Sequence, residues 1–452
     1  FIMLTSKIKH HRIFSKENNT RKYFIETYGC QMNVADTELV QAILENLGYS
    51  LARNLNSANI IFINTCAIRD HAEKKVNSQL GRYRLIKKKR PDTIIGVLGC
   101  MAQSLKHDIL ENKPYVDLVI GPDSYRRLPE ILERENNQKN VVDTQLSRFE
   151  VYEDLLPNRK DGINAWISIM RGCDKFCTFC IVPFTRGRER SRPLASIIAE
   201  AKQAIIDGFP EITLLGQNVN SYKNGYHNFE NLLFELSKLS GLKRIRFTSP
   251  HPSDMSDGVI DVISQYKNIC NYVHLPLQAG SDRILKRMNR NYSRAQFIRL
   301  AKRIRATIPN VGISTDIIVG FPGETDEDFK ETLEVMKEVK FDSAYNFIYS
   351  PRKGTKATEY EDYISENDKK KRLQDVIKLQ KLHTLERNKS LIGTFQEVII
   401  EKESKMSPNQ WAGRTDSNKW VIFDKEHLKI GDSVLIKIEK AVGLSLKGSI
   451  KL

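Results

Sequence analysis

The stretch AWISIMRGCDKFCTFC, residues 165–180, places three cysteines just after a short apolar run. The run AWISIM has the β-branched and aromatic composition of a buried strand. Cys173, Cys177 and Cys180 follow it at C-x3-C-x2-C spacing. Three soft thiolates on one loop predict an iron–sulfur or zinc site, because thiolates select these metals. Zinc usually takes a fourth protein ligand, and this loop contains none.

The sequence downstream of this loop alternates short apolar runs with helical patterns. Strands are predicted at EITLLG, KRIRFTS, YVHLPL, VGISTDIIVG and SAYNFIYS, with helices such as ASIIAEAKQAIIDG between them. Together with AWISIM, these βα repeats predict a central partial (βα)6 barrel that resembles part of a TIM barrel. A charged helix over 366–389 closes this block.

The upstream sequence predicts a separate α/β domain. The runs YFIETYG, ANIIFINT, TIIGVLG and VDLVIG alternate with helical patterns, which favours a doubly wound parallel sheet. The last sixty residues alternate apolar and polar side chains with short turns and predict a small antiparallel β-barrel. The chain therefore divides into a basic tail (1–20), an N-terminal domain (21–137), a linker (138–158), a core (159–389) and a C-terminal domain (390–452).

Three further cysteines lie at the ends of predicted N-terminal strands. Cys30, Cys66 and Cys100 end the runs YFIETYGC, IIFINTC and IIGVLGC. The carboxyl ends of strands in an open α/β sheet form one ligand crevice, so the three thiols are expected to converge on a second cluster. Cys270 has no partner pattern and is interpreted as a core residue.

Composition limits the class of protein. Of 452 residues, 71 are Lys or Arg and 55 are Asp or Glu, a net charge of +16. Seven cysteines are too few for a disulfide scaffold and suit a reducing cytoplasm. No apolar run approaches 18 residues and no secretory signal pattern precedes the fold, so no membrane partner is expected.

The positive charge suits a nucleic-acid partner. Residues 281–305 carry nine basic residues against one acidic residue, whereas residues 391–452 carry ten against eight. A second basic run is TRGRERSR, residues 185–192. Both runs could track phosphates or could be solvated helix faces. The candidate RNA contacts are Arg186, Arg188, Arg283, Lys286, Arg287 and Arg290.

The cysteine motif also supports a resemblance. C-x3-C-x-Phe-C, with Phe179 before the last cysteine, resembles the radical S-adenosylmethionine signature. The whole arrangement over residues 21–452 resembles the methylthiotransferases, and YGCQMNVADTE, NTCAIRDHAEKKV and GCMAQ are most similar to their MiaB subgroup, the tRNA-2-methylthio-N6-dimethylallyladenosine synthases. GRTDSNKWVIF, residues 413–423, resembles the core of a TRAM domain, an RNA-binding barrel.

This resemblance implies a radical transferase. Cys173, Cys177 and Cys180 would hold a 4Fe-4S cluster whose open iron binds S-adenosylmethionine, and Cys30, Cys66 and Cys100 would hold an auxiliary 4Fe-4S cluster that carries sulfur. The implied reaction places a methylthio group on carbon 2 of N6-isopentenyladenosine beside the tRNA anticodon. An electron donor such as flavodoxin or ferredoxin is implied, and no catalytic residue beyond the cluster ligands is assigned.

The sequence indicates the contacts to S-adenosylmethionine less clearly than it indicates the cysteine ligands. The Gly-Gly-Glu motif common in radical S-adenosylmethionine enzymes is replaced by LLGQNVNSY, so Gln217 and Asn218 are the candidates there. Gln278 lies at the expected barrel lip. Asp316 could bind ribose or could equally be a capped polar group of the core. Phe347 could stack on adenine, although alternating aromatic residues in a strand are usually core residues.

Three alternatives remain open. The same chemistry could act on another tRNA adenosine or on a ribosomal-protein aspartate. An RNA-binding iron–sulfur sensor would bind clusters without cleaving the cofactor. A zinc-ribbon RNA chaperone would contain no iron.

Overall fold

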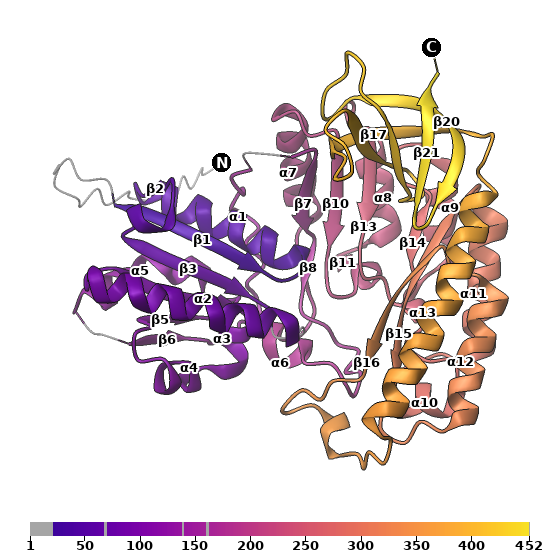
Figure 1. Ribbon diagram of the computed structural model, residues 1–452. Coiled ribbons are helices and arrows are strands. Elements are labelled where there is room, and N and C mark those ends of the chain that lie inside the picture. The colour runs from indigo at the N-terminus through magenta and orange to yellow at the C-terminus, as the bar shows by residue number, and fades with distance from the viewer. Residues whose placement is uncertain (1–20, 67–69, 138–139, 160–161, 452) are drawn as a thin grey trace, which may run out of the picture.

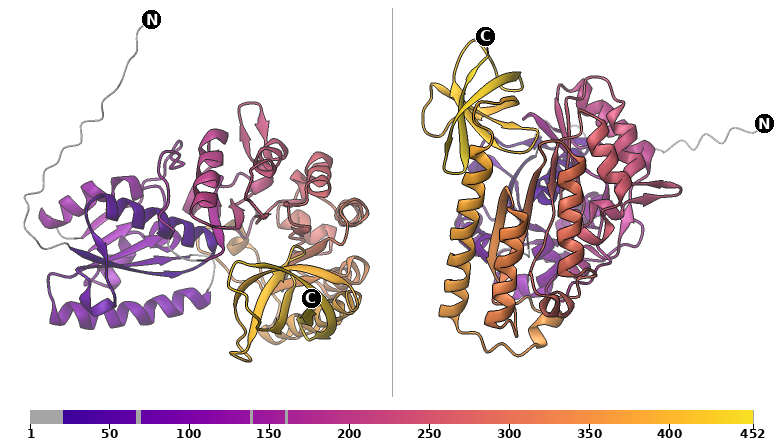
Figure 2. Two further views of the ribbon diagram at one scale, coloured as in Figure 1. Left: turned by 90° about the horizontal axis from the view of Figure 1, so that it is seen from above. Right: turned by 90° about the vertical axis from the view of Figure 1, so that its right-hand side faces the viewer.

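The structure is a computed structural model that describes residues 21–66, 70–137, 140–159 and 162–451. An N-terminal α/β domain lies beside a central barrel, and a small β-barrel covers one end of that central barrel (Figures 1 and 2). The fold class predicted from the sequence is confirmed. Across the described ranges, no helix has the length and apolar character needed to cross a membrane. The predicted tail lies outside the described residues. So do Ala67–Arg69, which contribute to the subgroup resemblance.

The N-terminal sheet has six parallel strands in the order β2-β1-β3-β4-β5-β6. Its strand β3 is buried on both faces: Phe62 packs in one core cluster, and Ile61 and Ile63 pack in the other. The sheet is therefore doubly wound, with α1 and α5 on one face and α2, α3 and α4 on the other. The bounds are β1 Lys22–Tyr28, α1 Gln31–Asn46, β2 Ser50–Leu51, β3 Ile60–Thr65, α2 Asp70–Lys89, β4 Ile94–Gly99, α3 Cys100–Leu105, α4 His107–Asn112, β5 Leu118–Ile120, α5 Leu128–Asn137 and β6 Val141–Asp143.

The strand order reverses direction at β1, which lies between β2 and β3. In doubly wound sheets, ligands bind outside the carboxyl ends of the strands at such a switch point. Cys30 follows β1 and Cys66 follows β3, so two of the candidate ligands flank this point.

The central barrel is open and consists of two three-stranded parallel sheets, β13-β10-β7 and β14-β15-β16. A parallel bridge between Ile245 and Ile269 joins the two sheets. The strands are β7 Asn164–Ser168, β10 Glu211–Leu215, β13 Arg244–Phe247, β14 Tyr272–His274, β15 Gly312–Val319 and β16 Ser343–Ile348, with short hairpins β8 Met170–Arg171 with β9 Arg190–Ser191 and β11 Lys223–Asn224 with β12 His227–Asn228.

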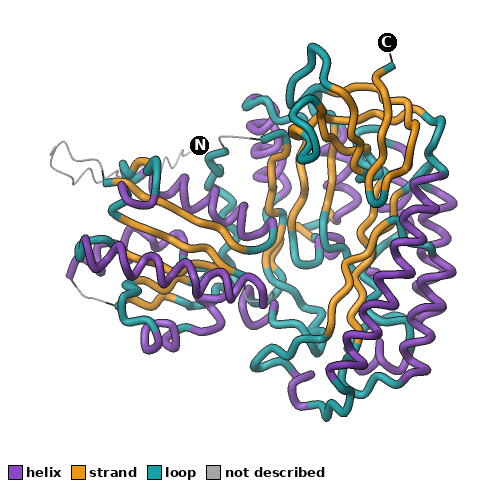
Figure 3. Tube along the Cα trace, viewed as in Figure 1, coloured by secondary structure: helices purple, strands orange, loops and turns teal. Residues whose placement is uncertain are grey.

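The helices of this block cover the outside of the strands and share one apolar core with them. The loops after the strands gather at the end away from the C-terminal β-barrel (Figure 3). That end is where βα barrels place their active sites. The helices are α6 Val182–Arg186, α7 Leu194–Ile206, α8 Phe229–Ser237, α9 Asp257–Gln265, α10 Asp282–Arg287, α11 Arg294–Thr307, α12 Asp326–Val339 and α13 Glu366–Lys389.

The C-terminal domain is a closed five-stranded barrel in the order β17-β18-β19-β21-β20. The purely antiparallel pairing predicted from the sequence needs one correction, because β19 pairs with β21 in parallel. Five strands in a ring cannot alternate in direction all the way round, so at least one pair must be parallel. The strands are β17 Phe395–Glu403, β18 Gln410–Thr415, β19 Trp420–Asp424, β20 Ser433–Val442 and β21 Ser445–Ile450.

Two buried arginines of β13 attach this small barrel to the amino ends of the central strands. Arg244 donates to the backbone carbonyls of Arg414 and Glu397 at 2.6 and 2.8 Å. Arg246 donates to the carbonyls of Thr415 and Asp416 at 2.8 and 3.0 Å. The small barrel therefore closes the amino end and leaves the carboxyl end of the central barrel for chemistry.

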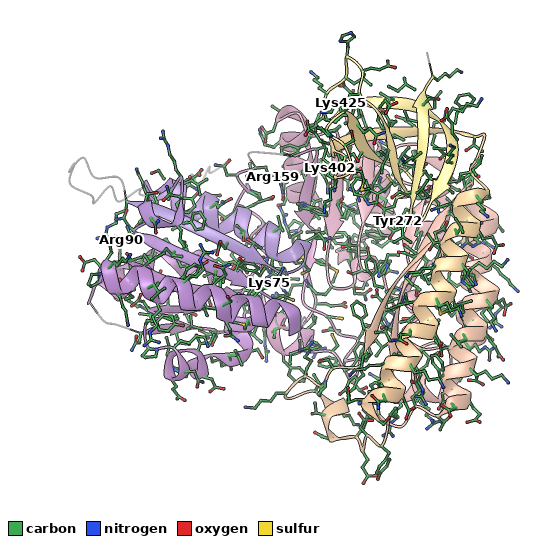
Figure 4. All side chains as sticks on the ribbon, viewed as in Figure 1. Lys75, Arg90, Arg159, Tyr272, Lys402 and Lys425 are labelled. Atoms are coloured by element: carbon green, nitrogen blue, oxygen red, sulfur yellow. The ribbon has the colours of Figure 1, made fainter. Side chains whose placement is uncertain are left out.

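Arg159 connects the N-terminal domain to the central barrel, between which it lies in Figure 4. It forms ion pairs with Glu38 of α1 at 3.1 Å and with Glu200 of α7, and donates to the carbonyl of Trp166 at 2.7 Å. Burial is the main reason that the pKa of Glu38 rises to about 7, with Arg159 opposing the rise and Glu200 adding to it.

We expect Glu38→Gln to gain stability relative to the wild type as pH rises from about 4.5 to about 7. The raised pKa means that the folded wild type holds a proton over this range that the unfolded chain releases, so its stability falls with pH. Glutamine has no such proton. The difference in melting temperature between variant and wild type should grow by a few degrees, since one pKa unit is about 1.4 kcal/mol. A difference that does not change with pH would contradict this expectation.

Candidate active site

The first cysteine loop lies at the carboxyl end of β7. Gly172 precedes Cys173 with φ of +81°, and a Cβ at Gly172 would lie 2.0 Å from the carbonyl oxygen of Arg188. Glycine is therefore needed where this loop crosses the segment that follows α6. The backbone N–H of Cys173 donates to the carbonyl of Gly187 at 3.1 Å, and that of Cys180 donates to the carbonyl of Cys177 at 2.9 Å.

The three thiols of this loop influence one another electrostatically. Burial raises the pKa of Cys173 to about 11 and that of Cys180 to about 12. Arg290 donates to Cys177 Sγ at 3.3 Å and to the carbonyl of Pro276 at 3.1 Å. Metal binding at this loop must therefore release protons, and a buried guanidinium is already placed to stabilise a thiolate at Cys177.

Unpaired polar atoms line the carboxyl ends of the next strands. Among the described residues, Gln217 Oε1, Asn218 Oδ1, His251 Nε2 and Gln278 Oε1 are buried without a hydrogen-bond partner. Burial lowers the pKa of His251 to about 3, with Arg290 and Lys175 adding to the effect, so its ring is neutral. Buried polar atoms are rarely left unpaired, which marks this lip as a site for a polar ligand.

The remaining candidates follow the inner face of β15 and β16. Gln278 has φ of +69° and is held by backbone bonds to Asp316 and Ile318, both 2.8 Å long. Asp316 faces His274, with Oδ2 and Nε2 3.3 Å apart. Ile318 is opposite Phe347, which is 48% exposed. Asp316 and Phe347 therefore line the open inner face, and neither is a core residue.

Cys30, Cys66 and Cys100 converge at the switch point of the N-terminal sheet. A hydrogen bond from Cys66, opposed by burial and assisted by Arg186, lowers the pKa of Cys30 to about 6. Burial raises the pKa of Cys100, although Arg186 opposes this shift. All seven cysteines of the chain are free thiols.

A buried amide network supports these three loops. Asn33 Nδ2 donates to Asn64 Oδ1 at 3.0 Å and to the carbonyl of Thr65 at 3.1 Å, while Asn64 Nδ2 returns a bond to the carbonyl of Asn33 at 2.9 Å. Gly99 has φ of +88°, and a Cβ there would lie 2.4 Å from Asn64 Oδ1 and 2.6 Å from the carbonyl of Thr65. The network and the glycine together fix the approach of Cys100.

Arg186 joins the two sets of cysteines. It ends the short helix α6, which begins two residues after Cys180. Its Nε donates to Cys100 Sγ at 3.2 Å, and its Nη2 donates to Asp36 Oδ2 at 2.7 Å. The loop of the central barrel and the crevice of the N-terminal sheet therefore form one continuous region.

Two of the expected RNA contacts are corrected by the structure. Arg186 and Arg290 are 3% and 8% exposed and bind cysteine sulfurs, so neither guanidinium can meet a phosphate at the surface. Arg188 is exposed and pairs with Asp174. Arg190 and Arg192 are also buried, so the run 185–192 is largely an internal network and not a basic patch.

The basic run 281–305 is partly neutralised by acidic neighbours. Ion pairs form between Arg283 and Asp328, Arg294 and Glu334, Lys302 and Glu338, Arg303 and Asp257, and Arg305 and Asp342. Arg287 donates to the carbonyl of Pro322 at 2.9 Å and covers the ring of Tyr360. Lys286 is exposed.

Each of the two sites offers three free thiols, the number that a four-iron cluster with one open iron would take. In the described ranges, no three His, Cys, Asp or Glu side chains are arranged to hold one metal ion. A single zinc draws four ligands into one tetrahedron, whereas each thiolate of a four-iron cluster binds its own iron atom. Two sets of three free thiols, with polar atoms unpaired beside the first, match this second arrangement.

Sequence reasoning missed several residues of the site. Asn33 and Asp36 are fully buried on α1. Asn33 accepts a hydrogen bond from Cys30, and Asp36 accepts one from Arg186. The available signal was the presence of two polar residues on a helix face that packs inward. His251 was also missed, because it follows β13 without any recognisable motif.

Comparison with known families assigns each part of this architecture. Residues 167–336 match the Radical SAM superfamily, residues 22–121 match the Uncharacterized protein family UPF0004, and residues 389–451 match the TRAM domain. Among solved structures, a radical S-adenosylmethionine methyltransferase, TsrM, from Kitasatospora setae matches with a TM-score of 0.55 and 14% identity, covering 73% of this chain and 75% of that chain. That similarity supports the fold alone.

Full-length relatives are much closer in sequence. A protein of Christiangramia forsetii is 46% identical, covering 96% of this chain and 94% of its own length. Proteins of Bacteroides thetaiotaomicron and Carboxydothermus hydrogenoformans are 45% and 43% identical, each covering 95% of this chain and 96% and 99% of their own lengths. All three are named tRNA-2-methylthio-N(6)-dimethylallyladenosine synthase. The chain belongs to this family of radical S-adenosylmethionine methylthiotransferases.

Proposed function

We propose that this enzyme places a methylthio group on carbon 2 of N6-isopentenyladenosine beside the anticodon of tRNA. The observation that carries the proposal is the bond from Arg186 to Cys100, which joins a three-cysteine loop of the barrel to a three-cysteine crevice of the N-terminal sheet. A transfer that needs both a radical and a sulfur source requires two such centres beside each other.

In this proposal Cys173, Cys177 and Cys180 hold a 4Fe-4S cluster, and Cys30, Cys66 and Cys100 hold the auxiliary 4Fe-4S cluster. Bound there, the clusters and S-adenosylmethionine supply radical and sulfur-transfer chemistry that amino-acid side chains lack.

Five side chains at the barrel lip and on its inner face are the proposed contacts for S-adenosylmethionine. The unpaired oxygens of Gln217, Asn218 and Gln278 would accept hydrogen bonds from it. Asp316 would bind its ribose and Phe347 would pack on its adenine. Arg290 holds Cys177 in place through its 3.3 Å contact with the sulfur.

The proposed partners are tRNA and a one-electron donor such as flavodoxin or ferredoxin, in the cytoplasm. The exposed cations Arg188, Arg283 and Lys286, with the half-buried Arg287, are the proposed phosphate contacts outside the C-terminal barrel. The proposed domain bounds remain those drawn from the sequence, with the linker ending at 158.

An anaerobic assay tests the proposal. The reconstituted enzyme is reduced in the presence of S-adenosylmethionine and isopentenylated tRNA, and the digested nucleosides are analysed by mass spectrometry. We expect 5′-deoxyadenosine and the 2-methylthio nucleoside. Cofactor cleavage without a modified nucleoside would favour another adenosine or a ribosomal-protein aspartate as substrate, and no cleavage would favour a cluster-binding sensor.

Gly99→Ala should weaken the auxiliary centre selectively. A methyl group at this position would clash with Asn64 and with the backbone of Thr65. Because the loop requires a positive φ here, the alanine would also be held in a left-handed backbone conformation, at a cost above about 1 kcal/mol. Iron should fall from about eight towards about four atoms per chain after reconstitution. Gly48→Ala is the matched control, because Gly48 has φ of +84° and nothing within 4 Å of its Cβ position. Equal iron in both variants would contradict this expectation.

A further inference from the structure

Three buried arginines lie against two buried aspartates where the N-terminal domain meets the barrel. Asp36 is shared by Arg171 at 2.9 Å and Arg186 at 2.7 Å. Asp123 pairs with Arg190 at 3.0 Å and lies 3.7 Å from Arg171. All five side chains are at most 5% exposed. The five side chains together carry three positive and two negative charges, and buried charges of this kind are costly unless they are paired.

Acids of the neighbouring ion pairs lie close to this group. Arg159 pairs with Glu38 and Glu200, and Arg192 pairs with Glu200. Arg126 pairs with both Glu150 and Asp154, and Glu150 also acts electrostatically on Arg171.

Arg186 is the member of the group that faces sulfur. Its Nε donates to Cys100 Sγ, and its charge also acts on Cys30. Its Nη1 is buried and has no hydrogen-bond partner among the described residues. A guanidinium has five N–H donors, so Nη1 keeps two unused donors on a side chain whose Nε already contacts Cys100.

We propose that Arg186 binds an anionic sulfur species held at the Cys30–Cys66–Cys100 site. Nε fixes the Cys100 thiolate, and Nη1 donates to a hydrosulfide or a methylthiolate beside it. This inference rests on the proposed function, in which that site carries sulfur. It replaces a surface role for Arg186 with a role in holding the sulfur between the two domains.

The test uses the full chain with Cys173, Cys177 and Cys180 replaced by alanine, so that only the auxiliary cluster is reconstituted. Sodium hydrosulfide is titrated anaerobically, and the electron paramagnetic resonance spectrum of the reduced cluster reports binding. We expect a saturable change in this parent protein. In Arg186→Gln, the hydrosulfide concentration for half-saturation should rise about tenfold or more, as expected for loss of a partner to a metal site.

Arg171→Gln is the matched control. It removes another buried guanidinium from the same carboxylate, but Arg171 donates to Asp36 and to the carbonyl of Pro122. Its half-saturation should stay within about threefold of the parent. Arg186→Lys keeps the positive charge but lacks the planar set of N–H donors. Its half-saturating hydrosulfide concentration should lie between those of the parent and Arg186→Gln. Equal affinities in the parent and Arg186→Gln would overturn the role of Arg186.

A measurement on the intact arginine covers the case in which these variants do not fold. Arginine labelled with 15N in its guanidinium is incorporated into the parent protein, and pulsed electron paramagnetic resonance is recorded with hydrosulfide bound. We expect a weak 15N coupling to the reduced cluster that Arg171→Lys does not remove. Absence of the coupling would overturn the inference. No response to hydrosulfide in the parent would instead contradict the proposed function.

Discussion

Cys177→Ala abolishes formation of 5′-deoxyadenosine, and with it every modified nucleoside. The substitution leaves two thiols on the barrel loop and removes the sulfur that Arg290 contacts at 3.3 Å. The expected loss exceeds the roughly 10–100-fold decrease that follows loss of a partner behind a metal ligand, because a ligand itself is removed. Anaerobic incubation with S-adenosylmethionine and dithionite, followed by chromatography, measures the product.

Cys270→Ala is the control for this experiment. Cys270 is 2% exposed and lies close to Arg244 and Arg246, at the opposite end of the barrel from the cysteine loop. The same thiol-to-methyl change there should cost some stability and leave cofactor cleavage intact. Cleavage by Cys177→Ala at the wild-type rate would rule out our assignment of the loop.

Cys66→Ala separates the two centres. Cys66 is 2% exposed and lies at the end of β3, where its hydrogen bond to Cys30 is the largest influence on that thiol. We expect the 2-methylthio nucleoside to fall by more than about a hundredfold, because an auxiliary ligand is lost. Formation of 5′-deoxyadenosine should continue, since the barrel loop is unchanged.

Both products are measured in one reaction by mass spectrometry, with Cys270→Ala again as the control. Loss of cofactor cleavage in Cys66→Ala would indicate that the two centres depend on each other for folding. Full methylthiolation in Cys66→Ala would exclude the auxiliary site as the sulfur source.

The six cysteines could be located from the sequence because strand ends in parallel α/β proteins converge. Cys30, Cys66 and Cys100 are far apart in the chain, and the position of each after an apolar run was sufficient to bring them together. Their supporting residues could not be found in this way. Asn33 and Asp36 become part of the site only because α1 turns them inward, which depends on tertiary packing.

The arginines show where composition is misleading. A run such as TRGRERSR is exposed in most proteins, since charged side chains are rarely buried without partners. Here two of the partners come from distant segments, Asp36 for Arg186 and Asp123 for Arg190, while Arg192 pairs with Glu200, eight residues further along the chain. No residue within the run indicates that these acids lie nearby, so the burial of its arginines could not be predicted from the local sequence.

The fold shows a similar limit. Alternating runs predicted both sheets and the final barrel, but they did not determine how the five-stranded ring closes. The parallel pairing of β19 with β21 is a property of the whole ring and cannot be seen in any one strand. The positive φ of Gln278 was equally invisible, because two long-range backbone bonds impose it.

The attachment of the C-terminal barrel has a consequence for how this protein can change over evolutionary time. Arg244 and Arg246 hold that barrel through four backbone carbonyls, which every amino acid supplies. Substitutions at residues 414–416, where β18 ends, therefore leave the acceptors of these bonds in place as long as the chain path is kept. The side chains on the outer surface of the barrel can therefore change without altering the bonds that seat it on the central barrel.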